Sequence, residues 1–140
     1  MRFIIGTDEA RPVVEHVAAH LQAKGHDVEV LPVRAWGETS VAVARAVAEK
    51  RADQGVVCCW TGTGASIAAN KVAGVRAALC GDAQTAAGAR KWNDANVLAL
   101  SLRTLSEPVA TEIVDAWLGA TYEASEDASL TVIAAEERAR

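Results

Sequence analysis

Short runs of hydrophobic residues alternate along the chain with longer segments in which hydrophobic residues recur every three or four positions. The short runs predict buried strands at residues 3–5, 28–31, 55–59, 75–79 and 96–100. The longer segments predict helices that begin near Pro12 and at 41–50, 66–71, 85–91, 108–118 and 129–138. Strands without polar alternation, separated by helices, are typical of a parallel sheet covered on both faces. We therefore expect one α/β domain over residues 1–140: a doubly wound, Rossmann-like sheet of five parallel strands in the order 2-1-3-4-5.

The segment after Tyr122 differs from the rest of the chain because it is poor in core residues and rich in acidic ones. A terminal helix with little core of its own often docks on another subunit, and a frayed end is the alternative. The hydrophobic pattern alone leaves both open.

Composition narrows the classes of function. The chain has 140 residues, of which 51% are hydrophobic and 23% charged, as in an ordinary globular domain. A net charge of −4 argues against a surface that binds nucleic acid or an acidic membrane. No hydrophobic run approaches the ~20 residues of a membrane span, and the first residues enter a strand pattern without the layout of a signal peptide. The three cysteines, two of them adjacent at Cys58 and Cys59, indicate free thiols in a reducing cytoplasm.

Ligands of such sheets bind beyond the carboxyl ends of the strands, where the strand order reverses, which here lies between the first and third strands. The loops expected there, residues 6–9 and 59–66, have unusual polar content. Gly62 and Gly64 let the backbone approach a ligand, and the N–H groups ahead of a helix can stabilise an anion such as a phosphate or an enolate. Ser66 can cap that helix, and a plain glycine turn is the alternative.

Cys59 and two acidic residues are the candidate reactive groups. A thiol beside N–H donors can have a lowered pKa and act as a base or nucleophile, although a buried cysteine is more often a small hydrophobe. Of Asp8 and Glu9, alternation sends only one into the crevice, and an acidic cap for the next helix is the alternative. His16 and His20 share a helix face, but no third ligand is in view, so we expect no metal.

Three segments resemble the type-B ribose-5-phosphate isomerase family, which includes the galactose-6-phosphate isomerase subunits. They are residues 59–72, with the motif Ser-Ile-Ala-Ala-Asn-Lys, residues 74–80, and residues 93–100, with the motif Asn-Asp-Ala-Asn. The resemblance extends to about Tyr122. It implies an aldose–ketose isomerisation of a small sugar or sugar phosphate, without metal or cofactor, through a cis-enediolate.

The resemblance also implies roles for individual residues. Cys59 matches the catalytic base of one branch of the family, Thr61 would support that base, and Asp8 matches an aspartate that contacts the substrate. The amides that would hold the enediolate oxygens belong to Gly62, Thr63, Gly64 and Ser66.

Family members work as dimers or tetramers with active sites between subunits. Asn93 matches an asparagine that arrives from the second subunit, and Arg103 matches an arginine that contacts phosphate in some members. The same property would explain a C-terminal helix that docks on a partner subunit.

Several departures from the family pattern fall in the expected pocket. Glu9 and Trp92 stand where the family has histidines, Trp60 replaces a glycine, and residues 128–133 lack the pair of arginines that grip phosphate. At an effective dielectric of ~20, two unit charges ~4 Å apart repel by about 4 kcal/mol, so Glu9 disfavours the usual phosphate.

We therefore expect a specificity altered from ribose 5-phosphate. The substrate would be another short sugar phosphate, held by Arg103 and Arg11, or a sugar without phosphate, with Trp60 and Trp92 as flat apolar walls. An epimerase and a non-catalytic sugar-binding subunit on the same scaffold are the alternatives.

Overall fold

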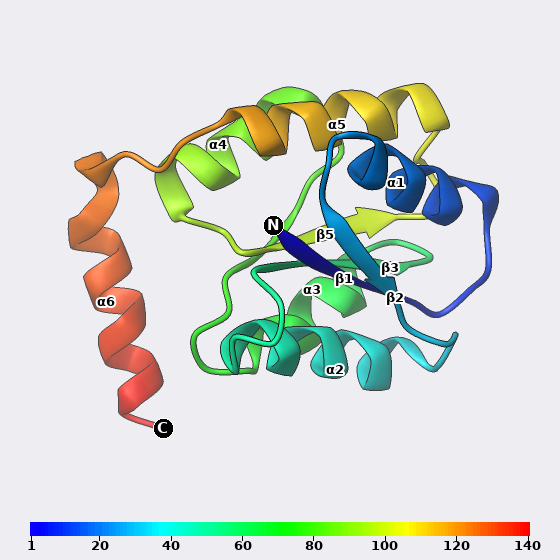
Figure 1. Ribbon diagram of the computed structural model, residues 1–140. Coiled ribbons are helices and arrows are strands. Elements are labelled where there is room, and N and C mark those ends of the chain that lie inside the picture. Colours follow the sequence, from blue (N-terminus) through cyan, green and yellow to red (C-terminus); the bar gives the residue numbers. More distant parts are fainter.

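A computed structural model describes all 140 residues and contains a five-stranded parallel sheet with helices on both faces (Figure 1). The strands are β1 (Arg2–Thr7), β2 (Asp27–Val30), β3 (Gln54–Cys59), β4 (Ala77–Leu79) and β5 (Val97–Ser101). The helices are α1 (Pro12–Ala23), α2 (Trp36–Ala48), α3 (Thr63–Asn70), α4 (Ala83–Asn93), α5 (Glu107–Gly119), the short 3₁₀ helix η1 (Ala124–Glu126) and α6 (Asp127–Arg138). This confirms the α/β class and the five parallel strands.

Two hydrophobic layers enclose the sheet. Helices α1, α4 and α5 cover one face, and α2 and α3 cover the other (Figure 1). Because side chains alternate along a strand, neighbouring residues of β3 enter different layers. Val56 and Cys58 face the α1–α4–α5 layer, whereas Val57 and Cys59 face the α2–α3 layer. The adjacent cysteines therefore have separate surroundings.

The predicted strand order 2-1-3-4-5 is wrong, because the sheet has the order β2-β1-β3-β5-β4. β5 has five residues and takes the interior position next to β3, where its residues 97–100 are at most 1% exposed. β4 has only three residues, none of them buried, and lies at the edge. The point of reversal between β1 and β3 is the same in both orders, so the expected location of the ligand does not change.

Two asparagines of the recognised motifs fasten β4 to its neighbours. The side chain of Asn70 accepts a hydrogen bond from the N–H of Ala77 at 2.8 Å and donates to the carbonyl of the same residue at 2.9 Å. Asn96 accepts from the N–H of Arg76 at 2.8 Å and donates to the carbonyl of Gly74 at 3.0 Å. These motif residues therefore build the fold and do not face the crevice.

Helix α6 stands apart from the body, on the side opposite to that toward which β5 points (Figure 1). None of its residues is buried. Its carboxylate at Glu137 accepts a hydrogen bond from the N–H of Gly74 at 3.2 Å. Docking of α6 on a partner subunit stays a prediction.

The shared face of His16 and His20 packs against α5. The His16 ring lies 2.7 Å from the hydroxyl of Thr111, and the His20 ring lies 2.6 Å from the carboxylate of Asp115. Both imidazoles therefore have partners on the neighbouring helix. None of the helices combines the length and the apolar character that a membrane span requires.

The two hydrogen bonds between the Asn70 side chain and the backbone of Ala77 predict that loss of Asn70 lowers the stability of the fold. Asn70→Ala removes two hydrogen bonds to β4, each worth about 0.5–1.5 kcal/mol net, so we expect the free energy of unfolding to fall by about 1–3 kcal/mol. Urea unfolding measures this change. Asn93→Ala is the matched control, because Asn93 lines an open groove and its loss should change stability by less than about 0.5 kcal/mol. Equal stability of the two variants would contradict the structural role of Asn70.

Candidate active site

Three loops meet at the carboxyl ends of the central strands. The N–H of Asp8, after β1, donates to the carbonyl of Cys58 at 3.3 Å. The N–H of Arg103, after β5, donates to the carbonyl of Trp60 at 2.8 Å. The predicted site residues of the two expected loops and Arg103 therefore lie along one edge of the sheet.

Gly62 turns the chain from β3 into α3. Its φ of +76° is in the left-handed region, and a Cβ there would lie 2.9 Å from the backbone carbonyl carbon of Leu100, so this position favours glycine. Gly62 is the N-cap of α3, and the N–H of Ser66 donates to its carbonyl at 3.1 Å. The expectation that Ser66 caps the helix is therefore wrong: the helix begins at Thr63, and Ser66 lies inside its first turn.

The start of α3 presents free backbone donors. The N–H groups of Thr61, Gly62, Gly64 and Ala65 have no hydrogen-bond partner in the chain. The Thr61 and Thr63 hydroxyls lie 2.7 Å apart. Unpaired N–H groups at a helix N-terminus carry partial positive charge, so this turn can hold an anion.

Trp36 forms one wall of this turn. A Cβ on Gly64 would lie 2.9 Å from its indole ring, yet the Trp36 side chain is 48% exposed. A flat aromatic face therefore lies beside the free N–H groups and remains open to solvent.

The Cys59 thiol ends β3 next to this turn. Cys59 is 5% exposed and belongs to the same hydrophobic cluster as Ala65 and Ala69 of α3. None of the five main cavities is lined by Cys59. In a single chain the thiol thus lies at the margin of the core and not on the wall of a formed pocket.

The other two cysteines are structural by their surroundings. Cys58 and Cys80 are each 1% exposed. Burial raises the pKa of each thiol to about 12, which keeps both protonated at neutral pH. Both therefore behave as small hydrophobes of the core.

Asp8 is half-buried beside the loop. Its Oδ1 atom is buried and has no hydrogen-bond partner. Burial raises the pKa of this carboxyl, a hydrogen bond with its own backbone opposes the rise, and the charge of Glu9 adds to it. The alternative of an acidic helix cap is wrong, because the N-cap of α1 is Arg11 and no side chain caps that helix.

Glu9, Arg11 and Trp60 form a cluster at the surface of the same edge. Arg11 donates from Nη2 to the Glu9 carboxylate at 3.0 Å, and its Cζ lies over the Trp60 ring, 5.0 Å from the centroid. The structure also brings in Arg34, whose N–H lies 3.4 Å from the carbonyl of Thr7. No motif in the sequence singles out Arg34, because the loop after β2 has no distinctive pattern.

Trp92 and Asn93 do not join this edge within one chain. They end α4, close to Arg76, which precedes β4 and pairs with Asp94 at 3.3 Å. The Trp92 ring packs over Gly88, where an added Cβ would lie 2.8 Å away, and its role as a wall of the substrate pocket stays a prediction.

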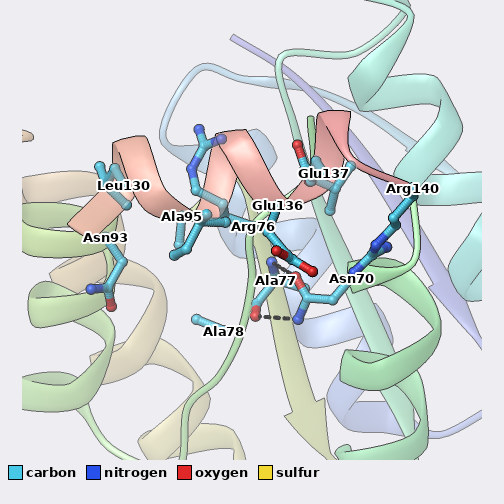
Figure 2. Close-up of a pocket in the computed structure, with 12 residues that line it drawn as sticks. Asn70, Arg76, Ala77, Ala78, Asn93, Ala95, Leu130, Glu136, Glu137 and Arg140 are labelled. Carbon is cyan, nitrogen blue, oxygen red and sulfur yellow. Dashed lines mark hydrogen bonds between the residues drawn. The ribbon is translucent and has the colours of Figure 1, made fainter. Parts of the chain in front are cut away.

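Two cavities flank the exposed edge strand β4, and Asn93 lines both. One, of about 410 Å³, lies under α6, and Figure 2 shows Leu130, Glu136 and Glu137 of α6 around it, with Arg140 just beyond the helix. The other, of about 510 Å³, lies between β4 and α4 and includes Leu79 and Trp92. No three His, Cys, Asp or Glu side chains gather closely enough to hold a metal ion.

Comparison with known proteins gives a consistent result. Residues 3–132 match the model of a family described as Ribose/Galactose Isomerase. The chain is 41% identical over 130 residues to ribose-5-phosphate isomerase B of Escherichia coli, covering 87% of this chain and 86% of that one. It is 37% identical over 126 residues to D-erythrulose-4-phosphate isomerase of Pectobacterium atrosepticum, covering 85% and 83%.

Solved structures agree with this result over nearly the whole chain. Ribose-5-phosphate isomerase B of Clostridium thermocellum superposes with a TM-score of 0.94 at 34% identity, covering 99% of both chains. The enzyme of Mycoplasma genitalium with bound ribulose-5-phosphate gives a TM-score of 0.93 at 30% identity, covering 99% of this chain and 97% of that one. The chain therefore is an isomerase and belongs to the ribose/galactose isomerase family.

Proposed function

We propose that this protein interconverts an aldose phosphate and its ketose phosphate through a cis-enediolate, with the Cys59 thiolate as the base. The observation that carries the proposal is the position of Cys59, at the end of β3 beside the free N–H groups that open α3. The named relatives act on pentose and tetrose phosphates, so these are the first substrates to consider.

The chemistry requires a base and an anion-binding turn on the same side of the sugar. Cys59 would remove the proton from C2, and the negative charge would pass to the oxygen on C1. The N–H groups of Thr61, Gly62, Gly64 and Ala65 would stabilise that enediolate, as backbone donors do for other oxyanions. Return of the proton to C1 then yields the ketose.

Asp8 suits the second proton transfer. Isomerisation also moves a hydroxyl proton from the oxygen on C2 to the oxygen on C1. A carboxyl with a raised pKa and an unpaired buried oxygen can accept and return such a proton. Thr61, whose hydroxyl is held by Thr63, would steady the turn between the base and the N–H groups.

A second subunit would complete the site. β4 is an edge strand with Leu79 39% exposed, and Leu79 contacts Gly62, since a Cβ on Gly62 would lie 2.5 Å from its side chain. With a two-fold axis near the middle of β4, the β4 strands of two chains would lie side by side and antiparallel. The Asn93 end of one chain would then lie beside the Gly62 end of the other, and Trp92 would form a wall of that shared pocket.

The charge at the site supports a specificity altered from ribose 5-phosphate. Glu9 adds a carboxylate to the edge where the substrate would bind, and Arg11 neutralises it. Arg103 forms no ion pair and is held to the loop through its backbone. We propose Arg11 and Arg103 as the cations that contact the phosphate.

The role of Cys59 predicts a large kinetic effect. Cys59→Ala should lower kcat by about 100–10,000-fold, because it removes the general base. Turnover of ribose 5-phosphate and of tetrose phosphates, with deuterium incorporation from solvent, measures this effect and separates isomerisation from epimerisation.

Cys58→Ala is the matched control for that variant. It alters the neighbouring thiol, which faces the opposite layer, and should leave kcat within about threefold. Unchanged turnover in Cys59→Ala would exclude Cys59 as the base, and a wild-type protein inactive on the whole panel would favour a non-catalytic sugar-binding subunit.

The raised pKa of Asp8 predicts that its carboxylate lowers the stability of the fold although it supports turnover. Because its folded pKa lies above 3.8, the ionised carboxyl destabilises the fold, and stability is lost as the pH rises through that raised pKa. Asp8→Asn should therefore be more stable than the wild type at pH 7 but not at pH 3, while losing turnover. Thermal unfolding across this pH range measures the difference, and a loss of stability at pH 7 would contradict the expectation.

Shared sites predict complementation between inactive variants. Cys59→Ala and Asn93→Ala damage opposite halves of the proposed site. Random reassortment after mild denaturation makes half of the dimers mixed, each with one intact site of two, so activity should return to about a quarter of the wild-type value. No recovery, with mixed dimers verified by mass spectrometry, would mean that Asn93 acts within its own chain or not at all.

A further inference from the structure

Several hydrogen bonds hold the cluster of Glu9, Arg11 and Trp60 in place at the surface. The N–H of Glu9 donates to the Thr7 hydroxyl at 3.3 Å, and that hydroxyl donates to the Glu9 carbonyl at 2.8 Å. The Trp60 carbonyl accepts from the N–H of Arg103 at 2.8 Å and from the Ser101 hydroxyl at 3.1 Å. Both residues that contact the Arg11 guanidinium therefore have restrained backbones.

The guanidinium of Arg11 retains unused donors. A guanidinium has five N–H donors in one plane, and the Glu9 carboxylate takes one of them at Nη2. The guanidinium carbon lies over the Trp60 ring, a contact that takes up no hydrogen-bond donor, so the other donors remain free. The Arg11 side chain is 37% exposed and lines a hollow of about 280 Å³ at the start of α1.

The place of this cation relates it to the reacting groups. Trp60 stands in the chain between Cys59 and Thr61, so the guanidinium over its ring lies at the loop that carries the thiol and the free N–H groups. Arg34 and Arg103 reach the same edge, but neither guanidinium makes an ion pair or a hydrogen bond that would hold it in one orientation. Arg11 is thus the only arginine of this edge whose charge is held in place.

We propose that Arg11 is the principal phosphate-binding residue of this enzyme and that Glu9 and Trp60 are positioning residues that orient it without touching the substrate. The group that Arg11 binds is the phosphate monoester of the sugar. The identity of the sugar itself rests on the proposed function. Bidentate contact from a restrained guanidinium loses little side-chain freedom on binding. The Glu9 carboxylate, which by itself would repel the phosphate, then orients the Arg11 guanidinium that binds it.

Steady-state kinetics with a sugar phosphate and with the same sugar lacking phosphate tests the proposal. Arg11→Ala should raise KM for the phosphorylated sugar about 10–100-fold with kcat changed less than about threefold, as expected for loss of a charge-assisted contact. Glu9→Gln and Trp60→Phe should raise the same KM by about 3–10-fold, and none of the three should change the constants for the unphosphorylated sugar. Arg11→Lys should restore little, because an ammonium lacks the planar fork.

A matched ion pair elsewhere in the chain supplies the control. Arg51 pairs with Glu49 at 2.9 Å with the same spacing of two residues, in the turn before β3 at the opposite end of the sheet. Glu49→Gln and Arg51→Ala should leave all constants unchanged. The proposal would be overturned if Arg11→Ala, Glu9→Gln and Trp60→Phe changed KM equally for the two sugars. A lower KM for the phosphorylated sugar in Glu9→Gln would also overturn it.

Calorimetric titration with inorganic phosphate separates this proposal from the proposed function. Binding of phosphate at least tenfold weaker in Arg11→Ala, and weaker in Glu9→Gln and Trp60→Phe, supports the assignment even if the wild type isomerises none of the sugars tested. Phosphate binding unchanged in Arg11→Ala would overturn it, whether or not the wild type is active.

Discussion

The left-handed turn at Gly62 is the constraint on which the candidate site depends. β3 ends buried between β1 and β5, and its chain must leave the sheet at once without striking β5. A side chain at this position would meet the backbone of Leu100, and the φ of +76° would strain any other residue. Because the turn is so tight, α3 begins one residue later and its free N–H groups come to lie next to Cys59.

The pleat of β3 then decides which cysteine can react. Cys58 and Cys59 are neighbours in sequence, but alternation puts the first under α1 and α5 and the second under α3. Burial raises the pKa of Cys58 to about 12. Cys59 is slightly more exposed and lies beside the start of α3 with its free N–H groups. One step along a strand therefore separates a structural thiol from a candidate base.

The sequence patterns predict the parts of the molecule that depend on local chemistry. Pro12 opens α1, Gly25 follows its end with a φ of +92°, and the polar loops lie at the carboxyl edge as expected. What they do not predict arises from contacts distant in sequence. β4 and β5 are both short hydrophobic runs, and only packing in three dimensions puts β5 inside. Likewise, no local pattern indicates that Arg11 lies over Trp60, because the two residues are 49 positions apart and meet only when β1 pairs with β3.

The motifs that carry the family resemblance act mainly through β4. Asn70 and Asn96 hold the start of this strand from both sides, and Asp94, with a φ of +47°, pairs with Arg76 just ahead of it. A three-residue edge strand has little stability of its own, so these side-chain hydrogen bonds help to hold it in the sheet. In the proposed dimer, a second copy would pair with this open edge, which lies next to Gly62 at one end and Asn93 at the other. In the proposed shared site, Asn70 and Asn96 would therefore act through the position of β4 and not by contact with the substrate.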